Sequence, residues 1–124
     1  MSAKDNVKFE LENHQPLTTA AFQILLTLAD GEKHGYAIMQ EAHDRAGRSS
    51  LLGPGTLYRT IKQLLSQDLI EESNRRHASE DDERRRYYRL TGLGEKVFRA
   101  ETERLKSLAK LAESKCRKLH PRTA

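Results

Sequence analysis

The sequence predicts a mainly helical protein with one small β-hairpin, in the order helix, helix, helix, hairpin and long helix. Two observations lead to this prediction. Apolar residues recur at helical spacing in four segments between residues 17 and 119. Between the third and fourth of these, two short runs rich in Arg, Tyr, Ile and Leu flank a polar loop. We expect an N-terminal arm or short helix over 1–16, a three-helix and hairpin unit over 17–91, and a helix over 92–124.

The first two helices are each marked by an apolar stripe and by a glycine that ends it. The first stripe consists of Leu17, Ala21, Ile24, Leu25 and Leu28, and it stops at Asp30-Gly31. The second consists of Ile38, Ala42 and Ala46, and it stops at Gly47. His34 stands just before the second helix, so we interpret it as a hydrogen-bonding turn residue.

The third helix follows a cluster of helix-breaking residues, Gly53, Pro54 and Gly55, and can begin only where the proline serves as its first turn. Its inner face is formed by Leu57, Ile61 and Leu64 or Leu65. The side chains expected to face outward are Thr56, Arg59, Thr60, Lys62 and Gln63. A short polar face of this kind is suited to contacts with another molecule.

The predicted hairpin joins residues 69–76 to residues 84–91 through the acidic loop at 77–83. Tyr87 and Tyr88 alternate across the second strand, so we expect one in the core and the other exposed. Arginines stand on both sides of the loop, at Arg75, Arg76, Arg84 and Arg85. Considered without the rest of the sequence, these arginines could simply lie on solvent-exposed strands, with their charge balanced by nearby acidic residues.

The C-terminal helix carries apolar residues at a strict spacing of seven, with Lys115 as an interruption. This stripe favours dimerisation, although it could also pack back on its own domain. Leu, Ile, Val and Phe account for only 26 of 124 residues, a lean core that a partner subunit would complete. The residues expected at the dimer interface are Val97, Phe98, Leu105, Leu108, Ala112 and Leu119.

This order of elements is that of a winged helix-turn-helix with an added C-terminal helix, and the third helix stands in the recognition position. Its N-terminal end would meet base edges and phosphates of B-DNA. The residues that we expect there are Pro54, Gly55, Thr56, Tyr58, Arg59 and Lys62, while the four loop arginines would contact phosphates. The alternative is a winged-helix module that binds a protein or RNA.

Several short motifs, taken in this order and spacing, resemble the PadR family of bacterial transcriptional regulators over residues 17–115. They are His34-Gly35-Tyr36, Gly55-Thr56-Leu57-Tyr58, Leu69-Ile70, and Arg86-Tyr87-Tyr88-Arg89-Leu90-Thr91 with Gly94. The resemblance, to the shorter type with one C-terminal helix, implies a two-fold dimer that represses neighbouring genes until an effector loosens the DNA complex. By position it also implies that Tyr36, Thr56 and Tyr58 contact DNA and that arginines around 75 and 84–86 belong to the wing.

Two features depart from that family pattern. Some relatives bind flat aromatic drugs between tryptophans, but this chain has no Trp, so we do not expect that ligand mode. The acidic loop would be repelled by DNA, and we expect it to pair with the arginines or to point away. Any effector is unidentified; Phe22, Phe98 and Leu105 would line an interface pocket or simply belong to the core.

Other function classes are not favoured by the sequence. It contains no Gly-rich phosphate loop and no recognisable nucleophilic triad, so we expect neither an enzyme nor a cofactor. The five histidines are scattered and Cys116 is the single cysteine, so no metal site is expected. No apolar run is long enough for a membrane span and no secretory signal is evident, which predicts a cytoplasmic protein without membrane contact.

Overall fold

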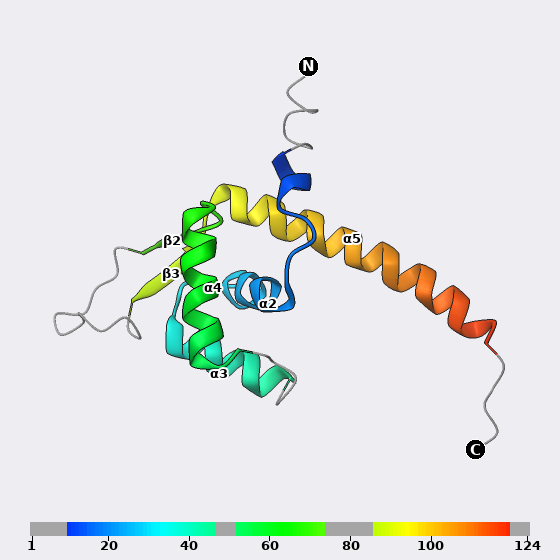
Figure 1. The fold of residues 1–124 in the computed structure, drawn as a ribbon, viewed down its shortest axis with the longest axis horizontal. Helices are drawn as coiled ribbons and strands as arrows, with labels where there is room; N and C mark the ends of the chain where they lie inside the picture. The colour runs from blue at the N-terminus through cyan, green and yellow to red at the C-terminus, as the bar shows by residue number, and fades with distance from the viewer. Residues whose placement is uncertain (1–9, 47–51, 74–85, 120–124) are drawn as a thin grey trace.

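The computed structural model describes residues 10–46, 52–73 and 86–119 of the chain (Figure 1). The elements in these ranges are α2 (Thr19–Leu28), β1 (Lys33–His34), α3 (Gly35–Ala46), α4 (Pro54–Ser66), β2 (Ile70–Glu72), β3 (Tyr87–Leu90) and α5 (Gly92–Arg117). This arrangement confirms the predicted fold class. Helices α2, α3 and α4 form a body, from which α5 projects as a long arm (Figure 1).

Each helix begins where a local signal in the sequence favours it. Thr18 caps α2, because its hydroxyl accepts a hydrogen bond from the backbone N–H of Ala21 at 3.1 Å. Helix α4 starts at Pro54, whose missing N–H is not needed in the first turn. Thr91 caps α5 in the same way as Thr18 caps α2, accepting from the N–H of Gly94 at 2.9 Å.

The core lies where one face of each helix meets the sheet. Its fully buried members include Ile24 and Leu25 of α2, Ile38 of α3, Leu57 of α4 and Val97 of α5. Burying an aliphatic side chain of this size contributes about 1.5–3 kcal/mol to folding. The body is therefore held by one continuous apolar cluster that reaches only the first turns of α5.

The sheet has three antiparallel strands in the order β1-β3-β2, one more than the predicted hairpin. The additional strand is β1, in which Lys33 pairs with Tyr88 and His34 with Tyr87. Tyr88 is buried and Tyr87 is half-buried, so Tyr88 is the core member of the tyrosine pair. Strand β1 ties the connection between α2 and α3 to the C-terminal strand of the hairpin.

Three sequence expectations need correction. Thr60 does not face outward: it is 7% exposed, and its hydroxyl donates to the carbonyl oxygen of Thr56 at 2.7 Å. Val97 is fully buried within its own chain, so it is not available to a partner subunit. Leu119 is exposed but lies beyond Arg117, the last residue of α5, and so does not continue the helical stripe.

The first turn of α5 is seated against the turn that joins α4 to β2. A Cβ atom at Gly94 would lie only 1.9 Å from the backbone oxygen of Leu69, so no larger residue fits at this position. Thr91 completes the junction, with its N–H donating to Leu69 O at 3.1 Å and its hydroxyl to Asp68 O. None of the described helices is long and apolar enough to cross a membrane.

Candidate nucleic-acid interface

Helix α4 presents one buried and one polar face. Leu57, Ile61 and Leu64 are buried, confirming the predicted inner face. The predicted contact residues lie on the other side: Pro54, Gly55, Arg59 and Lys62 are exposed, and Thr56 and Tyr58 are half-buried. The N-cap residue, Gly53, makes no side-chain cap hydrogen bond. Among the described residues, the positive end of the helix dipole carries no side-chain cap, and the exposed cations Arg59 and Lys62 follow in the second and third turns.

The beginning of α3 lies directly against α4 at this end. A Cβ atom at Gly35 would be 3.0 Å from Cε1 and 3.1 Å from the hydroxyl oxygen of Tyr58. Only glycine permits the ring of Tyr58 to approach the backbone of α3 so closely without displacement. The first turns of the two helices, with Tyr36 on one and Tyr58 on the other, therefore form one surface.

Tyr36 is the most exposed aromatic residue in the described part of this surface, with 48% of its area accessible. Its hydroxyl oxygen accepts a hydrogen bond from Nε2 of Gln40, one turn further along α3, at 2.6 Å. A phenol that accepts through its oxygen keeps its hydrogen for donation. Tyr36 is thereby prepared to donate a hydrogen bond outward to an anion such as a phosphate.

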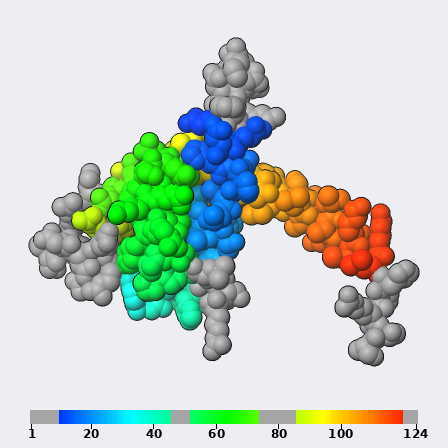
Figure 2. All heavy atoms as spheres, viewed as in Figure 1, coloured from blue at the N-terminus to red at the C-terminus, as the bar shows by residue number. Residues whose placement is uncertain are grey.

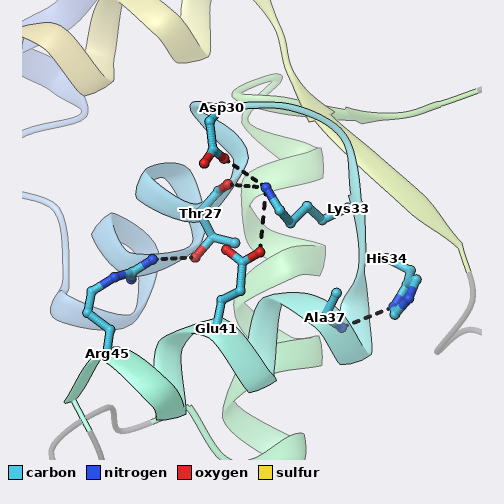
Figure 3. Close-up of polar contacts among 7 residues, drawn as sticks. All are labelled: Thr27, Asp30, Lys33, His34, Ala37, Glu41 and Arg45. Atoms are coloured by element: carbon cyan, nitrogen blue, oxygen red, sulfur yellow. Dashed lines mark hydrogen bonds and ion pairs between the residues drawn. The ribbon is translucent and has the colours of Figure 1, made fainter.

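A polar cluster around Lys33 fixes α3 relative to α2 (Figure 3). The Lys33 ammonium donates to the carbonyl oxygen of Thr27 at 3.1 Å and to the Asp30 carboxylate at 2.7 Å, and Glu41 lies 3.7 Å away. The hydrogen bond and charge of Lys33 lower the pKa of Asp30. Arg45 of α3 donates to the buried hydroxyl of Thr27 at 3.3 Å, which closes the cluster.

His34 performs the structural task that the sequence predicts. Its Nδ1 accepts a hydrogen bond from the backbone N–H of Ala37 at 3.0 Å, which caps the first turn of α3 (Figure 3). Its ring also packs edge-on against Tyr87, with ring centroids 5.5 Å apart. His34 therefore connects the start of α3 to the sheet.

The arginines on the described part of the hairpin are paired with acids. Arg89 Nε lies 2.9 Å from the Glu71 carboxylate and its Nη1 lies 3.6 Å from Glu32, and these partners raise the pKa of Arg89. Arg86 lies 3.6 Å from Glu72. The strands themselves thus present little uncompensated positive charge. The predicted wing contacts Arg75, Arg76, Arg84 and Arg85, and the acidic residues 80–83, lie outside the described residues.

A second exposed surface, which we call the α5 stripe, consists of Leu105, Leu108, Leu111 and Ala112. The three leucines are 39%, 50% and 56% exposed, respectively. Phe98 precedes the stripe and is half-buried, stacked on Phe22 of α2 at 5.3 Å between ring centroids. Successive exposed leucines on one helix mark an interaction surface rather than a solvated face.

Glu101 is the main residue that the sequence analysis did not single out. It is 1% exposed, although a glutamate in a helix is expected to face solvent. No local pattern could have revealed this, since its partner Leu17 lies 84 residues away in the chain. Among the described residues, no group of three or more His, Cys, Asp or Glu side chains is placed to hold a metal ion.

Comparison with known proteins places this geometry in context. The family model described as the transcriptional regulator PadR-like family matches residues 24–100, from within α2 to within α5. No curated protein sequence matches the chain.

Solved structures with a similar fold include three regulators. A PadR family transcription regulator from Clostridium difficile is 24% identical, with a TM-score of 0.67 over 78% of this chain and 97% of that one. A PadR-like transcription factor from Bacteroides fragilis is 24% identical, with a TM-score of 0.65 over 89% and 98% of the two chains. A PadR-like transcriptional regulator from Bacillus cereus is 16% identical, with a TM-score of 0.63 over 76% and 87%.

Proposed function

The chain belongs to the PadR-like family of transcriptional regulators, and from this premise we propose that it acts as a repressor, bound to operator DNA as a homodimer. The family is one of DNA-binding regulators and not of enzymes. The observation that supports the proposal best is the N-terminal half of α4, which begins without a side-chain cap and carries exposed Arg59 and Lys62 in its second and third turns. A cationic helix end of this kind fits the major groove.

In the proposed complex, α4 lies in the major groove and supplies sequence specificity. Arg59 has the planar fork that matches O6 and N7 of a guanine, and the exposed side chain extends from the second turn of the helix. Lys62, one turn further, provides a point charge for a phosphate. The helix N-terminus at Pro54, Gly55 and Thr56 receives a backbone phosphate through its N–H groups.

The remaining contacts position the protein on the duplex. Tyr36 donates its hydroxyl hydrogen to a phosphate, supported by Gln40, and Tyr58 lies beside it against Gly35. The arginines at 75, 76, 84 and 85 are proposed to contact phosphates of the neighbouring groove without reading sequence. Since Arg86 and Arg89 are paired with acids, they are not part of this proposal.

A second copy of the chain is the proposed partner of the α5 stripe, with half-buried Phe98 at the N-terminal end of the contact. A two-fold dimer would place two α4 helices in successive major grooves, about one helical turn apart, over a pseudo-palindromic operator. The protein would act in the cytoplasm, where it meets DNA. A small-molecule effector that loosens the DNA complex would relieve repression.

The proposal is tested with a fluorescent duplex that covers the region upstream of the protein's own gene, against a scrambled duplex, at low and physiological salt. We expect about a hundredfold preference for the native duplex, retained at physiological salt. Binding to neither duplex would refute the assignment of α4 as a recognition helix. Equal binding to both, abolished by modest salt, would refute specific recognition and favour a protein partner.

A further inference from the structure

We propose that Glu101 fixes the direction in which α5 leaves the body of the molecule, and that it thereby sets the spacing between half-sites that the dimer accepts. The second part of this inference rests on the proposed function; the first part does not. Glu101 is a positioning residue in this account and makes no contact with DNA.

The Glu101 carboxylate is buried and fully engaged. Its Oε2 accepts a hydrogen bond from the backbone N–H of Leu17 at 2.7 Å and another from Nη2 of Arg104 at 3.0 Å, while Oε1 accepts from Nε of Arg104. The bonds from Arg104 outweigh the effect of burial and lower the pKa of Glu101, so the side chain is ionised at neutral pH. One charged group thus joins α5 to the segment that precedes α2.

Glu101 is also the last buried residue of α5. The earlier anchors are Gly94 against Leu69, Val97 in the core, and Phe98 on Phe22. After Glu101, the residues of α5 are exposed except for half-buried Arg104 and Ser114, and the helix extends away from the body (Figures 1 and 2). The carboxylate therefore lies where the supported part of the helix ends and the unsupported part begins.

The segment that Glu101 contacts borders a hollow on its other side. This hollow of about 150 Å³ lies between residues 13–18 and the C-terminal part of α4, where Gln63, Leu64 and Gln67 line it. Leu17 itself packs against the apolar core, so the backbone N–H that Glu101 accepts belongs to a residue held by the body of the molecule. The hydrogen bond from Leu17 to Glu101 is a direct link between that segment and α5.

Burying a carboxylate at this point of α5 is energetically unfavourable, and we interpret its presence there as fixing the direction of the helix. A buried carboxylate loses most of its hydration, and here Arg104 compensates for that loss while 36% of its own side chain stays exposed. What the carboxylate adds is geometry: Arg104 of the same helix holds it in place, and its Oε2 accepts the N–H of Leu17 at 2.7 Å, which restricts how α5 can be oriented relative to the segment before α2. The position of Glu101 at the exit of α5 is where such a restriction has the greatest effect.

The length of the unsupported helix converts a small rotation into a large displacement. From residue 101 to Arg117 the helix advances about 24 Å at about 1.5 Å per residue. A tilt of about 10° at Glu101 would therefore move its end by about 4 Å, close to the rise of one base pair, which is about 3.4 Å. Since the α5 stripe lies on this part, the tilt would change the separation of the two α4 helices in a dimer.

The direction of α5 can be measured without DNA. Spin labels on the native Cys116 and on a cysteine introduced by Asp44→Cys, both exposed sites, report the distance from the arm to α3. Labelled protein is diluted in an excess of unlabelled Cys116→Ser protein, so that only distances within one chain contribute. We expect a narrow distribution for the parent and for Glu103→Gln, which changes an exposed carboxylate of the same helix.

Two variants of Glu101 test the inference in the same background. Glu101→Gln keeps an acceptor for Leu17 and removes the charge, and Glu101→Leu removes both. We expect the mean distance to shift or the distribution to broaden by about 4 Å, less for Gln than for Leu, as the lever arm predicts. Distributions that match the parent in both variants, with folding confirmed by circular dichroism, would overturn the inference.

The consequence for DNA is tested with an operator duplex selected by the unmodified protein and with versions that add or remove one or two base pairs between its half-sites. We expect the unmodified protein and Glu103→Gln to discriminate about tenfold or more against altered spacing, and Glu101→Gln to discriminate about twofold. Unchanged discrimination in Glu101→Gln would overturn the role in spacing. Absence of any DNA binding by the unmodified protein would refute the proposed function, while the distance measurement still decides the role of Glu101.

Discussion

Helices α4 and α5 are both amphipathic, yet they leave opposite kinds of side chain uncovered. Helix α4 buries Leu57, Ile61 and Leu64 and exposes Arg59 and Lys62. Helix α5 buries its apolar residues only up to Glu101 and then exposes Leu105, Leu108 and Leu111. The side chains that a helix leaves exposed indicate which kind of partner can cover them. Exposed positive charge favours a polyanion, and exposed leucine side chains favour another apolar surface.

The two helices also differ in what holds them. Helix α4 is packed along its whole inner face, which holds it rigidly in the body. Helix α5 is supported by its first turns and by the single Glu101 contact. Under the proposed function, recognition depends on side-chain identity in α4, whereas dimerisation depends on the anchoring and stripe of α5. Four predictions test this division, from the largest expected effect to the smallest.

Gly94→Ala is expected to have the largest effect, because it disrupts the close contact between the first turn of α5 and the backbone of Leu69. The added Cβ would lie 1.9 Å from Leu69 O, and backbone on both sides must move to accommodate it. We expect a decrease of about 3 kcal/mol or more in the free energy of unfolding, measured by urea denaturation. Gly92→Ala is the control, since a Cβ there meets nothing within 4 Å. An unchanged stability of Gly94→Ala would contradict the described seating of the helix.

Replacing Leu105 and Leu108 together by Asp should abolish dimerisation without unfolding the chain, since both side chains are exposed within one protomer. We expect the dimer Kd to rise about 100-fold or more, equivalent to about 3 kcal/mol. Sedimentation equilibrium measures the change, and Lys110→Asp on the same helix controls for the added charge. A double variant that remains dimeric would show that the α5 stripe is not the interface.

Arg59→Ala and Lys62→Ala separate base reading from phosphate binding within α4. We expect Arg59→Ala to weaken binding by about 1–3 kcal/mol and to relax the preference at one base pair. Lys62→Ala, like Arg84→Ala combined with Arg85→Ala, should weaken binding to all sequences and lower the salt slope by about 1 for each phosphate that is no longer neutralised. Fluorescence anisotropy on a panel of duplexes measures both, with Arg99→Ala of α5 as control. Equal effects on every sequence from Arg59 and Lys62 would contradict the division.

The smallest expected effect concerns the pH dependence of stability. Because Arg104 and Leu17 lower the pKa of Glu101 in the folded chain, the unfolded chain binds the proton more readily. This stabilisation is complete above the unfolded pKa and disappears as pH falls through the folded value. Urea denaturation between about pH 6 and pH 3 should show a steeper decline in stability for the parent than for Glu101→Gln. If the stability of both proteins declined equally with falling pH, the contacts of the Glu101 carboxylate with Arg104 and Leu17 would contribute no stability.

The order of elements was predictable because it depends on local signals. Apolar periodicity defined α2 to α5, and Pro54 and the glycines marked their limits. Strand β1 was missed because two residues, Lys33 and His34, carry no alternation, and only pairing with Tyr87 and Tyr88 makes them a strand. Long-range pairing of this kind leaves no periodic trace in the sequence.

The candidate DNA-binding surface was predictable in its main residues but not in their partners. Arg59 and Lys62 stand outside the apolar stripe of α4 and are exposed as expected, whereas Thr60 satisfies its hydroxyl on Thr56 and turns inward. The stack of Phe98 on Phe22 and the burial of Glu101 depend on where α5 crosses α2. That crossing is a property of the folded chain, so no local rule gives it.

Strand β1 has a consequence for how the molecule opens. Its two residues pair with β3, Lys33 anchors Thr27 and Asp30 of the α2 end, and His34 caps α3. Two consecutive residues therefore link β3 to the end of α2 and to the first turn of α3. In native-state hydrogen exchange, the amides of Ala37 and of the β1–β3 pairs should share one opening free energy and exchange as a single cooperative unit. A force applied to the hairpin would then reach the first turn of α3 without passing through the apolar core.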